Sequence, residues 1–145
     1  MKKKFKIGYT QGVYDMFHIG HLNILNRAKE QCEYLIVGVN SDRLVEEYKH
    51  KRTVIKQCDR ATIVENIKAV DKCVIVDTLD KVKILQEYHF EAIFIGDDWQ
   101  GNPRWVNTKE ELRALGVDVV FLPYTEGVSS SALRTVEEEH VEEDV

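Results

Sequence analysis

The sequence is poor in cysteine and proline and has no long hydrophobic run. Its three cysteines, at positions 32, 58 and 73, form no Cys-x-x-Cys pair, which argues against a structural zinc site and fits reduced thiols. No apolar stretch approaches the length of a membrane span. The N-terminal stretch Met1–Lys4, basic because of its three lysines, leads directly into a strand pattern without the apolar region of a signal peptide, so we expect a cytoplasmic protein.

An excess of positive charge is also missing. The net charge is −5, which argues against a broad surface for nucleic acid. The 145 residues are 43% hydrophobic and 31% charged, a composition typical of one globular domain. We expect that domain to span residues 1–136 and the acidic residues 137–145 to form a frayed tail.

Apolar runs alternate with helix-period patterns along the chain. The runs predict strands at Phe5–Gln11, Tyr34–Asn40, Lys72–Val76, Ala92–Ile95 and Val117–Leu122. Helices are predicted at Ile19–Gln31, after a cap at Asn40 or Ser41, at Arg60–Ala69 capped by Asp59, at Leu79–Tyr88, from Asn107 or Thr108 to Leu115, and from about Ser130. This alternation predicts an α/β protein with a parallel sheet and right-handed crossovers.

The stretch Gly12–His21 carries the strongest functional signal. It places Asp15, His18, Gly20 and His21 where the first strand gives way to the first helix. Parallel sheets bind ligands at such carboxyl ends, and a helix N-terminus attracts phosphate. Two histidines three residues apart there could donate to phosphate oxygens, whereas a zinc site would need a third ligand that the sequence does not offer.

This stretch resembles the HxGH motif of the cytidylyltransferase group of nucleotidyltransferases. Tyr124–Ser131 is similar to a second motif of that family, Arg-Thr-x-Gly-Ile-Ser-Thr, and Gly96–Trp99 (Gly-Asp-Asp-Trp) resembles its glycerol-3-phosphate branch. The three fall in family order, and the similarity runs from about Lys3 to Arg134. The resemblance implies a Rossmann-like five-stranded parallel sheet with helices on both faces, and a homodimer.

The resemblance implies CMP transfer from CTP to a small phosphorylated alcohol, such as glycerol-3-phosphate, with release of pyrophosphate. The acceptor phosphate is already an anion, so the reaction needs positioning and charge neutralisation rather than a base. His18, His21 and Lys51 are the expected catalytic residues. The basic stretch 48–52 would close on the triphosphate, and the acceptor contacts expected by resemblance are Asp15, Lys49, Lys51 and Arg60.

Nucleotide contacts are expected at both motifs and at the Gly-Asp-Asp-Trp stretch. They are Gly12, Val13, Tyr14, His18, Gly20, His21, Asp97, Trp99, Tyr124, Thr125, Gly127, Val128, Ser129, Ser130 and Ser131. Ser129–Ser131 would open the last helix as a second anion cradle. Mg²⁺ is expected on the phosphates of CTP, with Asp15 either holding the metal or orienting the acceptor.

Two positions depart from the family pattern. Tyr124 stands where the family usually has arginine, and tyrosine cannot supply that charge or its planar fork of donors. The stretch 77–80 lacks a lysine that glycerol-3-phosphate members often carry, and Lys81 is the nearest cation. The alternatives are therefore another phosphorylated alcohol, an adenylyltransferase of the same superfamily acting on a cofactor precursor, or a catalytically silent nucleotide-binding domain.

Overall fold

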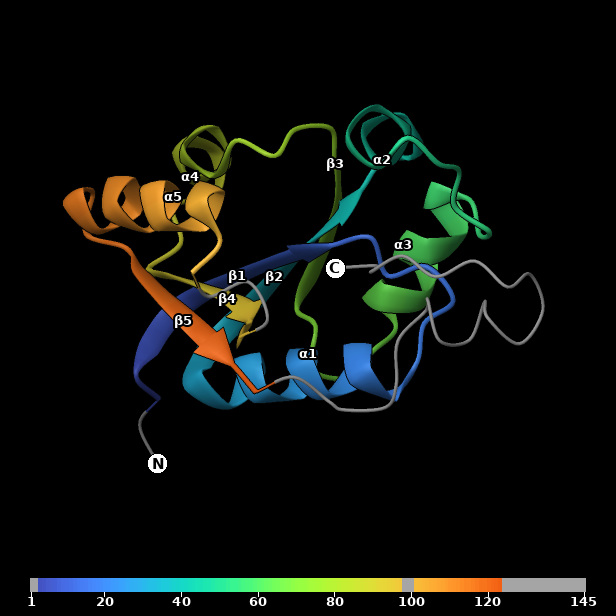
Figure 1. Cartoon of the computed structure of the whole chain (residues 1–145). Helices are drawn as coiled ribbons and strands as arrows, with labels where there is room; N and C mark the ends of the chain where they lie inside the picture. Colours follow the sequence, from blue (N-terminus) through green and yellow to red (C-terminus); the bar gives the residue numbers. More distant parts are fainter. Residues whose placement is uncertain (1–2, 98–100, 124–145) are drawn as a thin grey trace.

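A computed structural model describes residues 3–97 and 101–123. Strands and helices alternate along these residues, as the hydrophobic pattern predicts (Figure 1). The elements are β1 (Phe5–Gly12), α1 (Ile19–Gln31), β2 (Cys32–Asn40), α2 (Asp42–Lys49), α3 (Gln57–Glu65), β3 (Lys72–Val76), α4 (Lys81–Tyr88), β4 (Ala92–Gly96), α5 (Pro103–Ala114) and β5 (Asp118–Leu122).

The five strands form one parallel sheet in the order β3-β2-β1-β4-β5. The chain moves outward from β1 to β3 and then crosses back to build β4 and β5 on the other side. The strand order therefore reverses between β1 and β4, and ligands bind at the carboxyl end of such a switch point. The predicted α/β fold, a five-stranded parallel sheet with helices, is confirmed.

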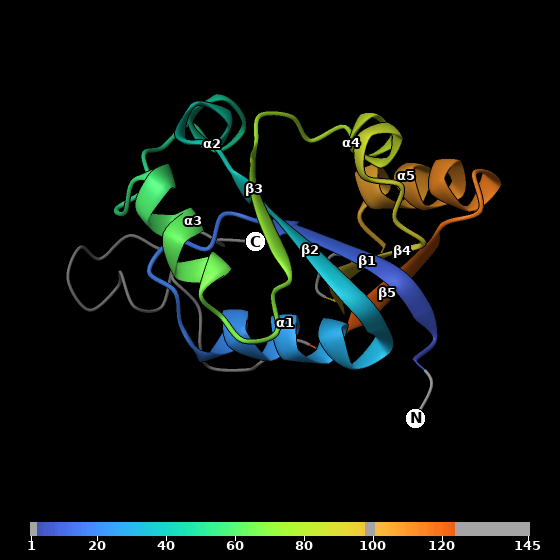
Figure 2. The same cartoon turned by 180° about the vertical axis from the view of Figure 1, so that it is seen from behind.

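Each face of the sheet is covered by helices, which explains the nearly continuous apolar runs of β2 and β4. On one face, Leu25 and Ala28 of α1 and Val64 of α3 are fully buried against the sheet. On the other, Ile84 of α4 and Leu112 of α5 pack against strand residues. Figures 1 and 2 show α4 and α5 side by side, on the opposite face from α1.

The observed first residues of the helices agree with the prediction in some cases and differ in others. Helix α1 has the predicted bounds, and Ser41 caps α2 by accepting from Leu44 N at 3.1 Å. Helix α5 begins at Pro103, before the predicted caps at Asn107 and Thr108, because the Asn102 side chain accepts from Arg104 N at 3.0 Å.

Helix α3 also begins earlier than predicted. It starts at Gln57 after Lys56, not after Asp59. The carboxylate that accepts the Gln57 amide, at 3.2 Å, belongs to Asp42 at the start of α2. A cap supplied from another helix leaves no signal in the local sequence, so the prediction was wrong. No helix in residues 3–97 and 101–123 is long and apolar enough to cross a membrane.

Candidate active site

The loop between β1 and α1 lies at the switch point of the sheet. Tyr14 and Met16 in this loop have positive φ angles of 56° and 49°, which turn the chain sharply from strand to helix. The ring of Tyr14 folds back over Gly12, where a Cβ atom would lie 3.2 Å from Tyr14 Cε2. Glycine at position 12 therefore leaves room for this tight turn.

His18 and His21 form a reciprocal capping box at the start of α1. The backbone N–H of Gly20 donates to Nδ1 of His18 at 3.1 Å, and the backbone N–H of His18 donates to Nδ1 of His21 at 3.2 Å. The two rings stack with centroids 3.9 Å apart. Because Nδ1 of each ring is an acceptor, the proton of each neutral imidazole is on Nε2. The pair therefore offers two Nε2–H donors in a fixed orientation.

His21 is held in its neutral form. Its pKa is lowered to about 3, mainly by burial and to a smaller extent by electrostatic interactions with His18 and Lys49. The rings of Tyr14 and Phe17 pack against the imidazole, with centroids 5.4 and 5.3 Å away. Tyr14, expected to contact nucleotide, is 5% exposed and belongs to the core here.

The structure brings Lys49 toward the histidine pair. Lys49 is the last residue of α2, its Nζ lies 5.9 Å from the centre of the Tyr48 ring, and its charge acts on His21. His50 follows with a positive φ of 58° and ends the helix. Lys51 comes next and is half-buried. The electrostatic link to His21 is to Lys49, and the catalytic role expected of Lys51 stays a prediction.

Asp15 and Arg60, both expected to contact the acceptor, are buried in this structure with 0% exposure. The Asp15 carboxylate accepts the amides of Val54 and Ile55, and the Arg60 guanidinium donates to backbone carbonyls. The geometry gives both a role in holding backbone that the sequence did not reveal. Contact of either side chain with an acceptor, and a metal on Asp15, stay predictions that these bonds do not support.

The other predicted nucleotide contacts divide into two groups. Val13 is buried, and Asp97 is exposed directly after β4, the strand beside β1 at the switch point. The remaining predicted residues, Trp99, Tyr124, Thr125, Gly127, Val128, Ser129, Ser130 and Ser131, lie outside the described residues, as does the tail 137–145. The described chain ends at Pro123, whose carbonyl accepts from Arg27 of α1 at 2.7 Å.

Sequence reasoning missed a polar cluster at the carboxyl ends of β1 and β2. Gln11 Nε2 donates to Asn40 Oδ1 at 2.8 Å and to the Thr78 carbonyl at 3.1 Å. Asn40 Nδ2 donates to the Tyr48 hydroxyl at 3.1 Å. The signal was present in the sequence, because Gln11 and Asn40 are amides at the carboxyl ends of two predicted strands.

Lys81, which the sequence analysis noted only as the cation nearest to residues 77–80, is buried in the structure. It begins α4 and is 7% exposed, with Nζ donating to the Leu79 carbonyl at 3.0 Å and lying 5.4 Å from the centre of the Trp105 ring. Its pKa is lowered to about 7, mainly by burial and also by the charge of Arg104, while Asp80 acts in the opposite direction. A buried lysine next to a second cation is stabilised in its charged form by a nearby anion.

Within the described ranges, no group of three or more histidines, cysteines and carboxylates is placed to hold a metal ion.

Comparison with known proteins agrees with this geometry. Residues 9–136 match the family model described as cytidylyltransferase-like. The chain is 31% identical to glycerol-3-phosphate cytidylyltransferase of Bacillus spizizenii over 86% of its own length and 92% of that protein. It is 32% identical to the bifunctional protein HldE of Caulobacter sp. over 88% of its length, but spans only 26% of that larger protein.

A solved structure supports the fold independently. The lipopolysaccharide core biosynthesis protein of Thermoplasma volcanium superimposes with a TM-score of 0.69 at 21% identity, covering 83% of this chain and 97% of that one. The family match covers most of the chain. It includes the loop between β1 and α1 (residues 13–18, the histidine loop), residues Lys49–Arg52 (the basic segment) and Lys81. By its sequence, the chain belongs to the cytidylyltransferase-like family of nucleotidyltransferases.

Proposed function

We propose that this protein transfers CMP from CTP to a small phosphorylated alcohol, glycerol-3-phosphate or a similar compound, and releases pyrophosphate. The observation that carries the proposal is the pair of neutral imidazoles at the α1 N-terminus, whose tautomers are fixed by the capping box. The 31% identity to a glycerol-3-phosphate cytidylyltransferase supports the choice of nucleotide and acceptor.

The chemistry suits donors better than a base. An oxygen of the acceptor phosphate attacks the α-phosphorus of CTP, a new P–O bond forms, and the bond to the β-phosphate breaks. Negative charge accumulates on the α-phosphate oxygens and on the leaving pyrophosphate. Two preorganised N–H donors and a helix N-terminus stabilise that charge without taking up a proton.

Positive charge comes from the basic segment and from a metal. Lys49, with Lys51 as the second candidate, neutralises the triphosphate from the side of α2. Mg²⁺ bound to the phosphates supplies further charge neutralisation when it is present. We place this metal on the triphosphate and not on Asp15, because the carboxylate of Asp15 accepts two backbone amides.

The acceptor end is proposed to lie near Lys81. Its buried ammonium, with Arg104 nearby, provides a cationic site where a phosphate restores charge balance. Gln11 and Asn40 connect this region to the end of β1, because Gln11 also holds the carbonyl of Thr78, three residues before Lys81.

An adenylyltransferase is the second candidate. The chain is about as similar to HldE, at 32% identity, as to glycerol-3-phosphate cytidylyltransferase, at 31%, so sequence similarity alone does not decide the nucleotide. A silent nucleotide-binding domain is the third. From the family resemblance we further propose that the protein is a cytoplasmic homodimer, which light scattering coupled to gel filtration would test.

The first test measures pyrophosphate release in the presence of Mg²⁺. Each of the nucleotides CTP and ATP is combined with each of four acceptors: glycerol-3-phosphate, glycerol-2-phosphate, phosphoethanolamine and phosphocholine. We expect release with CTP and one of these acceptors. Release with ATP alone would support an adenylyltransferase. If no pair reacts, calorimetric titration with CTP distinguishes an untested acceptor, where CTP binds, from a protein that has lost nucleotide binding.

His18→Asn should separate the cap from the chemistry. Asparagine is among the best N-cap residues, so stability should stay within about 0.5 kcal/mol of the wild type, while His18→Ala should lose about 1 kcal/mol. Both variants lack the Nε2–H donor and should lose at least about 10²-fold in turnover. Urea unfolding and pyrophosphate release measure the two effects, and wild-type turnover in His18→Asn would exclude the proposed donor.

The neutral state of His21 should be visible in the pH dependence of stability. The folded-state pKa is about 3 and the unfolded value about 6.5, so the unfolded chain binds the proton first and stability falls as the pH drops below 6.5. The loss for this group at pH 5 should be about 2 kcal/mol relative to pH 7.5.

His21→Gln is the matched control, because glutamine at this helix position keeps the capping box and does not titrate. Urea unfolding of both proteins at pH 5, 6 and 7.5 gives the part of the pH-dependent unfolding free energy that is due to His21. Parallel pH dependences in the two proteins would show that His21 takes up a proton in the folded state.

Lys81→Met should weaken acceptor binding more than nucleotide binding. Methionine keeps the apolar packing beside Trp105 and removes the ammonium. We expect at least about 10-fold higher KM for the acceptor with KM for CTP within about twofold, since a charged hydrogen bond contributes about 1.5–3 kcal/mol. The reverse pattern, with KM for CTP raised instead, would move Lys81 to the nucleotide side.

A further inference from the structure

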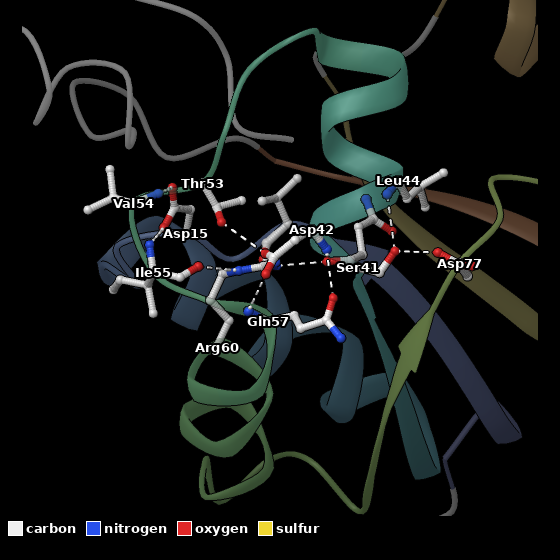
Figure 3. Close-up of polar contacts among 12 residues, drawn as sticks. Asp15, Ser41, Asp42, Leu44, Thr53, Val54, Ile55, Gln57, Arg60 and Asp77 are labelled. Atoms are coloured by element: carbon white, nitrogen blue, oxygen red, sulfur yellow. Dashed lines mark hydrogen bonds and ion pairs between the residues drawn. The ribbon is translucent and has the colours of Figure 1, made fainter.

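The segment that joins α2 to α3 is fastened by side chains from three other parts of the chain. We call Thr53–Gln57 the strap, and Lys49–Arg52, which precedes it, the basic segment. Figure 3 shows the strap held by Asp15 of the histidine loop, Asp42 of α2 and Arg60 of α3. A connection on the surface would ordinarily need no such set of partly buried bonds.

Asp15 joins the strap to the histidine loop. Its Oδ2 accepts the amide of Val54 at 2.7 Å, and its Oδ1 accepts the amide of Ile55 at 2.9 Å. The carboxylate is 0% exposed and lies three residues before His18. One side chain therefore ties the backbone of the strap directly to the turn that presents the imidazoles.

Arg60 of α3 makes a second connection between the strap and the histidine loop. Its Nε donates to the Ile55 carbonyl at 2.8 Å, and its Nη1 donates to the carbonyls of Val13 at 2.7 Å and Asn40 at 2.8 Å. The guanidinium is completely buried, so each of these bonds replaces a hydration bond lost on burial. The histidine loop, the end of β2 and the strap thus share one rigid, planar donor.

Asp42 closes the network at its outer side. It pairs with Arg60 Nη2, accepts the Thr53 hydroxyl at 3.0 Å and accepts the Gln57 amide at 3.2 Å. Burial acts to raise the pKa of Asp42, but the hydrogen bonds from Arg60, Gln57 and Thr53 outweigh it and hold the pKa below its usual value. The carboxylate is therefore ionised and bound at neutral pH.

These bonds fix both ends of the basic segment. Lys49 is the last residue of α2, whose first residue is Asp42, and the strap begins directly after Arg52. The distance from the cations of this segment to His18 and His21 therefore depends on the strap. Neither Asp15 nor Arg60 needs to reach a substrate to have this effect.

We propose that Asp15 and Arg60 are positioning residues that hold the basic segment in register with the two imidazoles. This inference rests on the proposed function, in which both groups act on one triphosphate. It differs from the expectation that Asp15 and Arg60 bind the acceptor, and the two can be separated by experiment.

The test variant is Asp15→Asn, which places an amide donor against one of the two backbone donors. Asp71→Asn is the matched control. Asp71 likewise accepts a backbone amide, that of Leu35 at 2.7 Å, and pairs with Lys29, but it precedes β3 at the amino ends of the strands, away from the basic segment. Trypsin cleavage after Lys49, Lys51 and Arg52, without any ligand, reports directly on the order of the basic segment.

We expect cleavage of the basic segment to rise severalfold in Asp15→Asn and to stay at the wild-type rate in Asp71→Asn. Thr53→Val, which removes only the hydroxyl bond to Asp42, should give a smaller rise and serves if Asp15→Asn does not fold. Equal cleavage in all four proteins would overturn the inference, whatever reaction the protein catalyses.

A double-mutant cycle supplies the kinetic readout. If Asp15 acts through the basic segment, Asp15→Asn should lower kcat/KM for CTP at least tenfold in the wild type and much less in a Lys49→Ala background. If Asp15 binds the acceptor, its substitution should instead raise KM for the acceptor by the same factor in both backgrounds, which would overturn the inference. Absence of turnover in the wild type would contradict only the proposed function, because the cleavage result stands separately.

Discussion

The buried guanidinium of Arg60 is the interaction on which the carboxyl edge of the sheet depends. A fully buried positive charge is tolerated only where fixed acceptors replace its hydration, and here those acceptors are three backbone carbonyls and one carboxylate. They come from the histidine loop, β2, the strap and α2. Because one planar group must satisfy all of them together, these four segments are held in a single relative arrangement.

The sequence predicted the fold well where the contacts that form an element lie within that element. Alternating apolar runs were sufficient for the order of strands and helices, because burial on both faces of a parallel sheet leaves a periodic signal. Helix α1 was predicted with its bounds, and its cap is made by residues within the same turn. Helix α3 was predicted three residues late, because Asp42 supplies its cap from fifteen positions away in the sequence.

The same distinction applies to the candidate site. His18 and His21 were identified from their spacing in a short sequence motif, and the structure shows that their capping contacts also lie within four residues. The sequence analysis expected Asp15 and Arg60 to contact the acceptor and gave Lys81 no contact. The surroundings of these side chains are made by segments distant in the sequence. These are the strap for Asp15 and Arg60, and Trp105 and Arg104 of α5 for Lys81. Residue type alone does not tell a substrate-binding arginine from one that binds backbone.

The stacking of the two imidazoles has a consequence for the whole site. Rings with centroids 3.9 Å apart in a buried site do not both carry a positive charge, and the pKa of His21 near 3 keeps that ring neutral. The pair can donate hydrogen bonds but cannot balance the charge of a triphosphate. In the proposed reaction that balance must come from the lysines and from Mg²⁺, and Coulomb attraction depends steeply on distance in a partly buried site. A network that fixes where the basic segment stands relative to the imidazoles therefore matters as much to the reaction as the imidazoles themselves.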